Sequence, residues 1–257
     1  IIIPESNYSM KEIIELFVKN KCNIISATPS FWRKVLMSKE SSNLSLKRAT
    51  LGGEISDESI LIALKNKFKD IKLTHIYAST EVGVGFAVTD GRAGFPYSYI
   101  ENGVGNIKLK IDDSSLLLIN PGKKTQNYLA IDSMYTDDGY INTGDLVKIE
   151  NYRVYFLGRE SGSINVGGNK VQPEEVEARL LESNLIQTAY VYAKKNSMMG
   201  SLVCADVIPK DLTVDKILLK KELLTYCRNN LENFKIPAII KIVDNLEITQ
   251  SGKIKRK

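Results

Sequence analysis

The sequence predicts an α/β protein in two parts, with an α/β layer and a small β unit in the first part and a small α+β domain in the second. Helical and strand-like patterns alternate at the start, short β segments fill residues 104–155, and a Gly-rich break is followed by a mixture of helix and strand. We place the boundary at this break, which predicts a first domain of residues 1–158 and a second of residues 159–257.

The α/β layer is predicted from two helix–strand units. Ser9 and Glu12 have the spacing of a capping box, so a helix begins there and a strand follows at 22–26. Its apolar face consists of Ile13, Ile14, Phe17 and Val18. In the second unit, Ser56 is expected to cap a helix over 57–68, before a strand over 71–78. The apolar side of this second helix consists of Ile60, Leu61, Leu64 and Phe68.

The small β unit is predicted from short β segments at 106–111, 115–120 and 152–158, which turn-forming residues separate. After the break, Pro173 stands in the first turn of a helix over 173–183. Strands at 188–195 and 202–209, an amphipathic helix over 214–232 and a strand at 238–243 complete the α+β domain.

Composition narrows the function. The chain has 257 residues, of which 43% are hydrophobic and 25% charged, enough for a sizeable core. Its net charge of +5 comes from 35 basic and 30 acidic residues that are well mixed, which argues against nucleic acid or an anionic membrane as partner. The three cysteines stand singly, which favours a reducing cytoplasm, and no apolar run approaches the roughly 20 residues of a membrane-spanning helix.

The chain opens on three isoleucines, which resemble an interrupted strand. We therefore expect a fragment of a longer protein, with Ile1 to Ile3 exposed or paired with another chain. Self-association through this face is a further expectation.

The stretch "IYASTEVGVG" ends a predicted strand with an aromatic ring, two hydroxyls and a carboxylate. Ligands of open α/β sheets bind beyond strand ends, so Tyr77 could stack on a base, Thr80 could donate to a phosphate and Glu81 could hold Mg²⁺. An ordinary turn capped by Thr80 and Glu81 is the alternative interpretation.

Two further clusters follow. In "YINTGDLVKI", Asp145 interrupts a β pattern and could accept hydrogen bonds from both hydroxyls of a ribose, although aspartate is also common in plain turns. In "LGRESGSINVGGNK", Arg159 offers a fork of donors, and Gly167 and Gly168 allow close backbone approach. The terminal "SGKIKRK" is not a P-loop, because Glu247 and Ile254 stand where that motif needs Gly and Ser or Thr.

The order of these motifs resembles the adenylate-forming superfamily of acyl-CoA synthetases, peptide-synthetase adenylation domains and luciferases. The matching segments are "GGE" at 52–54, "YASTE" at 77–81, "YINTGD" at 140–145, "GRE" at 158–160, "GGNKVQPEEVE" at 167–177 and "SGK" at 251–253. The resemblance covers nearly the whole chain and corresponds to the later part of a family member, whose large domain would end near residue 158.

The resemblance implies a substrate, nucleotide and metal for these residues. Family members form an acyl-adenylate from a carboxylic acid and ATP, and a thiol then displaces AMP. Catalysis is implied for Lys253, Thr80 and Glu81, with Glu81 as the Mg²⁺ ligand. Nucleotide contacts are implied for Gly53, Glu54, Tyr77, Ala78, Ser79, Thr80, Asp145 and Arg159. The glycines of "GGE" and "TEVGVG" would line the acyl pocket.

The family's hinge, about which its small C-terminal domain turns, corresponds to Glu160. Asn165, Gly167 and Gly168 correspond to the region of the thiol step. Many members have lysine at the position of Asn165, which leaves the thiol acceptor open. The family's phosphate loop lies upstream of the point where this chain begins, so we expect the fragment by itself to be inactive.

The sequence thus predicts part of an AMP-forming ligase that joins a carboxylic acid to CoA. One alternative is an enzyme that loads the acyl group onto the phosphopantetheine of a carrier protein. Another is a non-catalytic AMP-binding or scaffold protein.

Overall fold

The computed structural model describes residues 1–5, 7–79, 83–122, 135–247 and 254, with backbone only for residues 79, 83 and 84. The chain forms two compact units, residues 1–156 and residues 157–257, each described here by itself. The division falls within strand β9 (Arg153–Arg159), the strand in which the expected domain boundary also lies.

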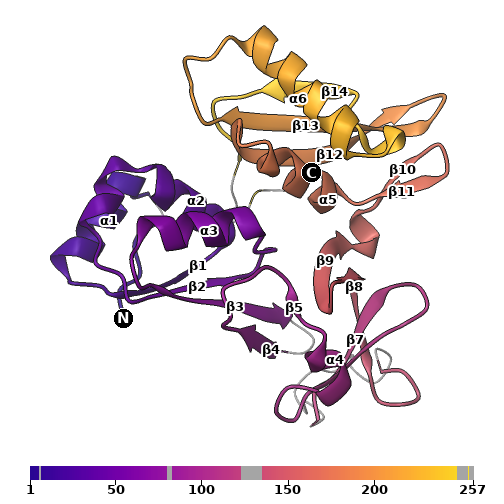
Figure 1. Ribbon diagram of the computed structural model, residues 1–257, viewed down its shortest axis with the longest axis horizontal. Helices are drawn as coiled ribbons and strands as arrows, with labels where there is room; N and C mark the ends of the chain where they lie inside the picture. The colour runs from indigo at the N-terminus through magenta and orange to yellow at the C-terminus, as the bar shows by residue number, and fades with distance from the viewer. Residues whose placement is uncertain (6, 80–82, 123–134, 248–253, 255–257) are drawn as a thin grey trace. The chain divides into compact units, whose positions relative to one another are not determined.

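The first unit contains a four-stranded sheet in the order β1-β2-β3-β4. Its strands are β1 (Ile24–Ala27), β2 (Arg48–Gly52), β3 (Lys72–Ser79) and β4 (Gly83–Val88). The first three pair in parallel, and β4 runs antiparallel to β3. Helices α1 (Met10–Lys19), α2 (Pro29–Met37) and α3 (Glu58–Lys67) pack on one face of this sheet, as Figure 1 shows. The predicted α/β layer is confirmed.

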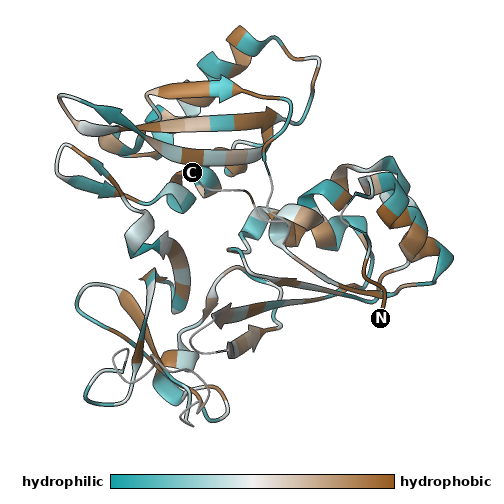
Figure 2. Cartoon of the chain, turned by 180° about the vertical axis from the view of Figure 1, so that it is seen from behind, coloured by the Kyte–Doolittle hydropathy of each residue, from teal (hydrophilic) through white to brown (hydrophobic). Residues whose placement is uncertain are grey.

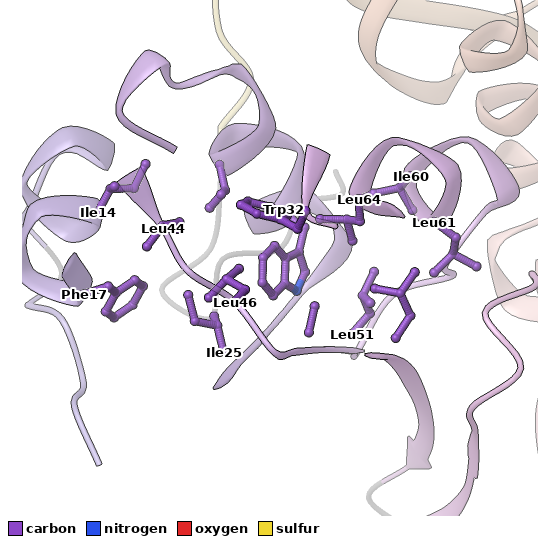
Figure 3. Close-up of a cluster of buried hydrophobic side chains, with 14 of the residues drawn as sticks. Ile14, Phe17, Ile25, Trp32, Leu44, Leu46, Leu51, Ile60, Leu61 and Leu64 are labelled. Carbon is purple, nitrogen blue, oxygen red and sulfur yellow. The ribbon is translucent and has the colours of Figure 1, made fainter. Parts of the chain in front are cut away.

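Trp32 lies at the centre of the core between these helices and the sheet (Figure 3). Its side chain is fully buried, and its indole Nε1–H donates a 3.1 Å hydrogen bond to the carbonyl oxygen of Thr50 in β2. The ring therefore joins α2 to the sheet through both packing and a satisfied donor.

The predicted cap is confirmed for one helix and is wrong by one residue for the other. Ser9 and Glu12 form the predicted capping box of α1. At α3 the cap is Asp57 and not Ser56, because the Asp57 carboxylate accepts from the backbone N–H of Ile60, three residues on. Val18 is also exposed, so the buried face of α1 is narrower than predicted.

Helix α2 was missed, although its signals are present in the sequence. Thr28 caps it by accepting from the backbone N–H of Phe31, and Pro29 occupies its first position. Trp32 and Val35 then bury one face. Because α2 has only nine residues, its apolar residues repeat too few times to distinguish a helix from the neighbouring patterns.

The predicted small β unit is a five-stranded sheet in the order β5-β9-β8-β7-β6. Besides β9, its strands are β5 (Phe95–Pro96), β6 (Lys108–Ile111), β7 (Leu116–Asn120) and β8 (Ile141–Glu150), with helix α4 (Ser98–Asn102) between β5 and β6. The described pairings β5–β9, β6–β7 and β7–β8 are antiparallel. Its core includes Phe86 and Val88 of β4, which joins the two sheets of this unit.

The second unit is the predicted α+β domain. Its strands are β10 (Ile164–Val166), β11 (Asn169–Val171), β12 (Ile186–Asn196), β13 (Gly200–Pro209) and β14 (Ile239–Ile242). Helices α5 (Pro173–Glu182) and α6 (Lys216–Asn230) share one core with the sheet. Figure 2 shows that the long strands β12 and β13 are apolar along much of their length. The β10–β11 hairpin was not predicted, because each strand has only three residues.

Within the described residues, no helix combines the length and the apolar character that crossing a membrane requires.

Candidate nucleotide-binding and thiol-acceptor sites

Asp145 lies on a bulge in the middle of β8. Leu116 of β7 pairs with Leu146, but Leu118 pairs with Asn142, so β8 has extra residues between these pairs. Gly144 has a φ of +69°, which a side chain would disfavour, and its N–H donates a 2.8 Å hydrogen bond to the side-chain oxygen of Asn142. Bulges of this kind redirect a side chain out of the strand's alternation, and here the redirected side chain is Asp145.

Thr143 fixes this bulge to the neighbouring strand. Its buried hydroxyl donates a 2.7 Å hydrogen bond to the carbonyl oxygen of Leu117. The hydroxyl oxygen of Thr143 also accepts a 3.1 Å hydrogen bond from the backbone N–H of Asp145. The threonine of "NTGD" therefore holds the backbone of the aspartate in place, a role that the motif alone does not indicate.

Tyr77, at a distant point of the sequence, contacts the same aspartate. Its phenolic hydroxyl donates a 2.6 Å hydrogen bond to Oδ2 of Asp145. A hydrogen bond to an ionised acceptor is among the stronger ones, so the pair orients both side chains. The structure thus brings together two of the residues predicted to contact a nucleotide.

The ring of Tyr77 is held by two phenylalanines. The rings of Phe86 and Phe156 both lie 5.2 Å from it between centroids, with interplanar angles of 15° and 1°. Gly85 provides the space for this arrangement, because a Cβ there would lie 2.9 Å from Cδ1 of Tyr77. Gly85 is the extra residue of β4 at a register shift, because Tyr77 pairs with Phe86 and Ala78 with Val84, so it is a bulge glycine beside the tyrosine.

The remaining residues of "YASTE" are only partly described. Ala78 is exposed in β3, and Ser79 ends that strand. Thr80 and Glu81, the predicted phosphate and Mg²⁺ contacts, lie outside the described residues, as does Lys253. In the part of the chain that is described, no group of three or more His, Cys, Asp or Glu could hold a metal ion.

Glu54 of "GGE" caps α2. Its Oε2 accepts a 2.8 Å hydrogen bond from the backbone N–H of Ser30, and its Oε1 accepts a 3.0 Å hydrogen bond from the Ser30 hydroxyl. A carboxylate is favoured at a helix N-terminus, where unpaired N–H groups point outward. Gly53 precedes Glu54 with a φ of +79°, so the chain turns at the end of β2 and Glu54 reaches the start of α2.

A charged cluster that no sequence motif indicates holds the loop between β4 and β5. The buried guanidinium of Arg153 donates from Nη1 and Nη2 to the two carboxylate oxygens of Asp90 at 2.8 and 3.1 Å, and also to the carbonyl oxygens of Arg92, Ala93 and Gly94. Burial pushes the pKa of Asp90 upward, but the hydrogen bonds from Arg153 and from the backbone N–H of Arg92, together with the charge of Arg153, outweigh it, so the net pKa is lowered.

His75, the single histidine of the chain, borders this cluster from β3. Its Nε2 lies 3.0 Å from the carbonyl oxygen of Arg92, so the neutral ring donates from Nε2. Burial lowers the pKa of His75 below its ordinary value of 6.5, although Asp90 partly opposes the shift. The imidazole is therefore a half-buried neutral donor to the loop, which favours a structural role.

In the second unit, Arg159 and Glu160 follow one another at the end of β9, and both are exposed. Glu160 begins a short 3-10 helix (η3, Glu160–Gly162), and its Oε1 lies 3.8 Å from the ammonium group of Lys170. An ion pair this exposed contributes between about 0 and 1 kcal/mol. Arg159 belongs to the other unit from Asp145, so its predicted contact with the same ligand stays a prediction.

The predicted thiol-step residues form the turn of the β10–β11 hairpin. Gly167 and Gly168 have φ values of +58° and +90°, as a two-residue hairpin turn with left-handed residues requires. The side-chain oxygen of Asn165 accepts a 2.9 Å hydrogen bond from the backbone N–H of Gly168. These three residues therefore lie together at one exposed hairpin tip.

All three cysteines are free thiols: Cys227 lies in the core of the second unit, Cys204 is buried in β13, and Cys22 follows α1. Burial raises the pKa of Cys227 to about 11, and it also raises the pKa of Cys204. Neither buried thiol is a nucleophile near neutral pH, because the thiolate is the reactive form.

Two family models match the chain. The model described as AMP-binding enzyme covers residues 1–126, and the model described as AMP-binding enzyme C-terminal domain covers residues 175–253. Together they account for most of the chain, with the first matching the unit that contains Tyr77 and the second matching the unit that contains α5 and α6.

Curated relatives match nearly the whole of this chain. The chain is 27% identical to a 2-succinylbenzoate–CoA ligase of Listeria monocytogenes, over 98% of this chain and 54% of that protein. It is 26% identical to a D-alanine–D-alanyl carrier protein ligase of Staphylococcus aureus, over 96% of this chain and 54% of that protein. The chain spans about half the length of these relatives.

Solved structures show the same fold. The anthranilate CoA ligase AuaEII, in complex with anthranoyl-AMP, matches with a TM-score of 0.81 over 99% of this chain and 52% of its own, at 19% identity. MatB from Rhodopseudomonas palustris, with bound ATP, matches with a TM-score of 0.77 over 98% of this chain and 52% of its own, also at 19% identity. With both family models matched and the fold shared, the chain belongs to the adenylate-forming superfamily of AMP-binding enzymes.

Proposed function

We propose that the protein is an ATP-dependent acid–thiol ligase and that the adenosine part of its nucleotide binds at Tyr77 and Asp145. The observation that carries the proposal is the 2.6 Å hydrogen bond between these two side chains. It sets an acceptor-only carboxylate beside an aromatic ring, the pair of groups that a ribose and an adenine need.

The surrounding contacts support this use. A ribose presents two neighbouring hydroxyl donors, and an ionised carboxylate offers two oxygens with several lone pairs. The bulge at Gly144 directs Asp145 out of the strand, and Thr143 holds its backbone. The parallel phenylalanines keep the Tyr77 ring in one orientation, so its hydroxyl and the carboxylate of Asp145 would meet the ligand already in place.

In the first proposed step, an oxygen of the substrate carboxylate attacks the α-phosphorus of ATP. The bond from that phosphorus to the bridging oxygen breaks, and pyrophosphate leaves with acyl-AMP as the product. Lys253 would stabilise the negative charge that gathers on the carboxylate and phosphate oxygens. Thr80 would donate to the phosphate, and Glu81 would hold the Mg²⁺ that accompanies ATP.

In the second proposed step, a thiol sulfur attacks the acyl carbon, the thiol proton passes to solvent, and the bond from that carbon to the AMP oxygen breaks, so AMP leaves. We propose that the second unit turns about Glu160 between the two steps and that the hairpin tip of Asn165, Gly167 and Gly168 then serves the thiol. The leading acceptor is CoA, as in the name of the Listeria relative. A carrier protein is the second candidate, which the Staphylococcus relative favours.

Exchange of radiolabelled pyrophosphate into ATP tests the first step. The natural polypeptide that carries this sequence is assayed with 2-succinylbenzoate, D-alanine and a series of aliphatic and aromatic carboxylic acids. We expect exchange that depends on one class of acid. Lys253→Ala should reduce it by about a hundredfold or more, because a full positive charge is lost from the reacting centre. Lys255→Ala, in the same basic tail, is the matched control and should exchange like the wild type.

Two results would overturn the proposal. Exchange that Lys253→Ala leaves unchanged would refute the assignment of this lysine. AMP binding without exchange for any acid would instead favour the non-catalytic AMP-binding alternative. Free CoA and a phosphopantetheine-bearing carrier protein, offered in parallel, then separate the two acceptors by which of them receives the acyl group.

A further inference from the structure

The tips of two hairpins in the second unit are joined. The backbone N–H of Gly167, in the β10–β11 turn, donates a 2.9 Å hydrogen bond to the carbonyl oxygen of Met199, in the β12–β13 turn. Each turn also has an asparagine at its start. Asn165 accepts from the backbone N–H of Gly168, and Asn196 accepts from those of Met198 and Met199 at 3.0 and 2.9 Å. The two turns therefore form one ordered surface.

The Met199 side chain lies directly against Gly167. A Cβ at Gly167 would lie 2.8 Å from Cε and 3.6 Å from Sδ of Met199, so a larger residue there would displace the flexible end of the methionine from the turn. Met199 remains 44% exposed, whereas its neighbour Met198 is 90% exposed. Of the two adjacent methionines, Met199 therefore contacts Gly167 and Met198 extends into solvent.

We propose that Met199 is a positioning residue for the β10–β11 turn and that, through this turn, it sets the rate of the thiol step. The inference rests on the proposed function, which assigns the thiol step to Asn165, Gly167 and Gly168. The β10–β11 hairpin has only three residues in each strand, and Val166↔Gly200 is its one registered pair with β13. A turn held by so few strand contacts depends on the side chain that packs against its tip.

Methionine suits this position because it is unbranched and fills irregular gaps. Its thioether covers the bare backbone of Gly167 without requiring a fixed rotamer. Alanine at 199 would keep the backbone hydrogen bond but remove this cover. The turn would then sample other orientations, and a displacement of about 1 Å at a reacting group can lower a rate by up to about a hundredfold.

The test compares Met199→Ala, Met199→Leu and Met198→Ala in the natural polypeptide that carries this sequence. For Met199→Ala we expect kcat/KM for the thiol acceptor to fall by about tenfold or more, with pyrophosphate exchange unchanged. Leucine keeps the apolar volume, so Met199→Leu should retain most of the thiol step. Met198→Ala is the matched control and should change neither step.

A double-mutant cycle isolates the contact itself. Gly167→Ala places its methyl against Met199 and should slow the thiol step. In the Met199→Ala background there is no methionine side chain left to displace from the turn, so Gly167→Ala should cost less there, with only the left-handed φ left to oppose it. Additive effects would show that the two residues do not act through one another, which overturns the proposal.

Amide hydrogen exchange gives a readout that needs no enzyme activity. We expect the Gly167 and Gly168 amides to exchange about tenfold faster in Met199→Ala and at the wild-type rate in Met198→Ala. Equal exchange in the two variants would refute the positioning role. If the wild type exchanges no pyrophosphate, the proposed function fails separately, and the hydrogen exchange still decides whether Met199 orders the turn.

Discussion

The hydroxyl of Tyr77 donates to the carboxylate of Asp145 across 68 positions of the sequence. One residue comes from β3 of the parallel layer, and the other comes from a bulge in the antiparallel sheet. The aromatic cluster of Phe86, Phe95 and Phe156 packs where these two sheets meet. The pair is therefore a direct consequence of how the two sheets of the first unit join.

Tyr77→Phe should weaken AMP binding. The ring remains, but Oδ2 of Asp145 loses its donor, and one hydrogen bond to a charged group is worth about 1.5–3 kcal/mol. We expect the dissociation constant, measured by isothermal titration calorimetry, to rise by about tenfold or more. Tyr99→Phe is the matched control, because Tyr99 belongs to the same aromatic cluster. Its exposed hydroxyl makes only a 3.3 Å hydrogen bond to the carbonyl oxygen of Ala87. An equal loss of affinity in both variants would contradict a specific role for Tyr77.

Gly85→Ala should displace the Tyr77 ring. Its Cβ would lie 2.9 Å from Cδ1 and 3.3 Å from the carbonyl oxygen of Tyr77, and the carbonyl belongs to a paired strand that cannot move away freely. We expect a loss of about 1–3 kcal/mol in the free energy of unfolding, together with weaker AMP binding. Urea unfolding measures the first and calorimetry the second. Gly162→Ala, with nothing within 4 Å of its Cβ position, should leave both unchanged.

Glu54→Ala should destabilise the first unit rather than act only on a ligand. The variant leaves the backbone N–H and the hydroxyl of Ser30 without their acceptor at the start of α2. A lost helix cap costs about 0.5–2 kcal/mol. Thermal unfolding measures the effect. Ser30→Ala removes only the hydrogen bond from the hydroxyl, so it should lower the unfolding temperature less than Glu54→Ala does. A wild-type unfolding temperature in Glu54→Ala would argue that this glutamate serves the nucleotide alone.

His75 should make stability fall as the pH is lowered below about 6.5. The folded-state pKa lies below the ordinary 6.5, because burial disfavours the charged ring. The unfolded chain therefore binds a proton first, and the free energy of unfolding decreases as the pH falls from about 7 until the folded-state pKa is passed. Besides burial, the carbonyl oxygen of Arg92 and the carboxylates of Asp90 and Glu58 favour the charged ring, and Arg153 opposes it.

His75→Gln keeps a donor for the carbonyl oxygen of Arg92 and cannot titrate. Urea unfolding of both proteins between pH 5 and 7.5 should show a difference in the free energy of unfolding that changes with pH at the lower end and becomes constant at the upper end. A constant difference over this range would mean that the histidine does not titrate on unfolding.

Local signals in the sequence predicted a large part of this fold. The capping box at Ser9 and Glu12 and the proline at the start of α5 act within one helical turn, so they can be read directly. The cap of α3 was wrong by one residue, because Ser56 and Asp57 are both good caps and only the geometry decides between them.

The site was less predictable where it depends on tertiary contacts. Asp145 and Tyr77 could be singled out as chemically suited to a nucleotide, and their motifs are typical of the family. Nothing local indicated that Phe156 stacks on Tyr77, that Thr143 bonds to β7, or that Arg153 holds Asp90. Each of these contacts joins residues that are distant in sequence, and a hydrophobic or charged pattern does not specify its partner.

The most direct test of the account is the affinity of AMP for the wild type and for Asp145→Ala, measured by isothermal titration calorimetry in the natural polypeptide that carries this sequence. The account predicts that the wild type binds AMP and that Asp145→Ala loses about tenfold or more in affinity, while Tyr99→Phe binds like the wild type. Equal affinity of the wild type and Asp145→Ala, or no AMP binding by the wild type at millimolar concentration, would contradict the assignment of the adenosine site.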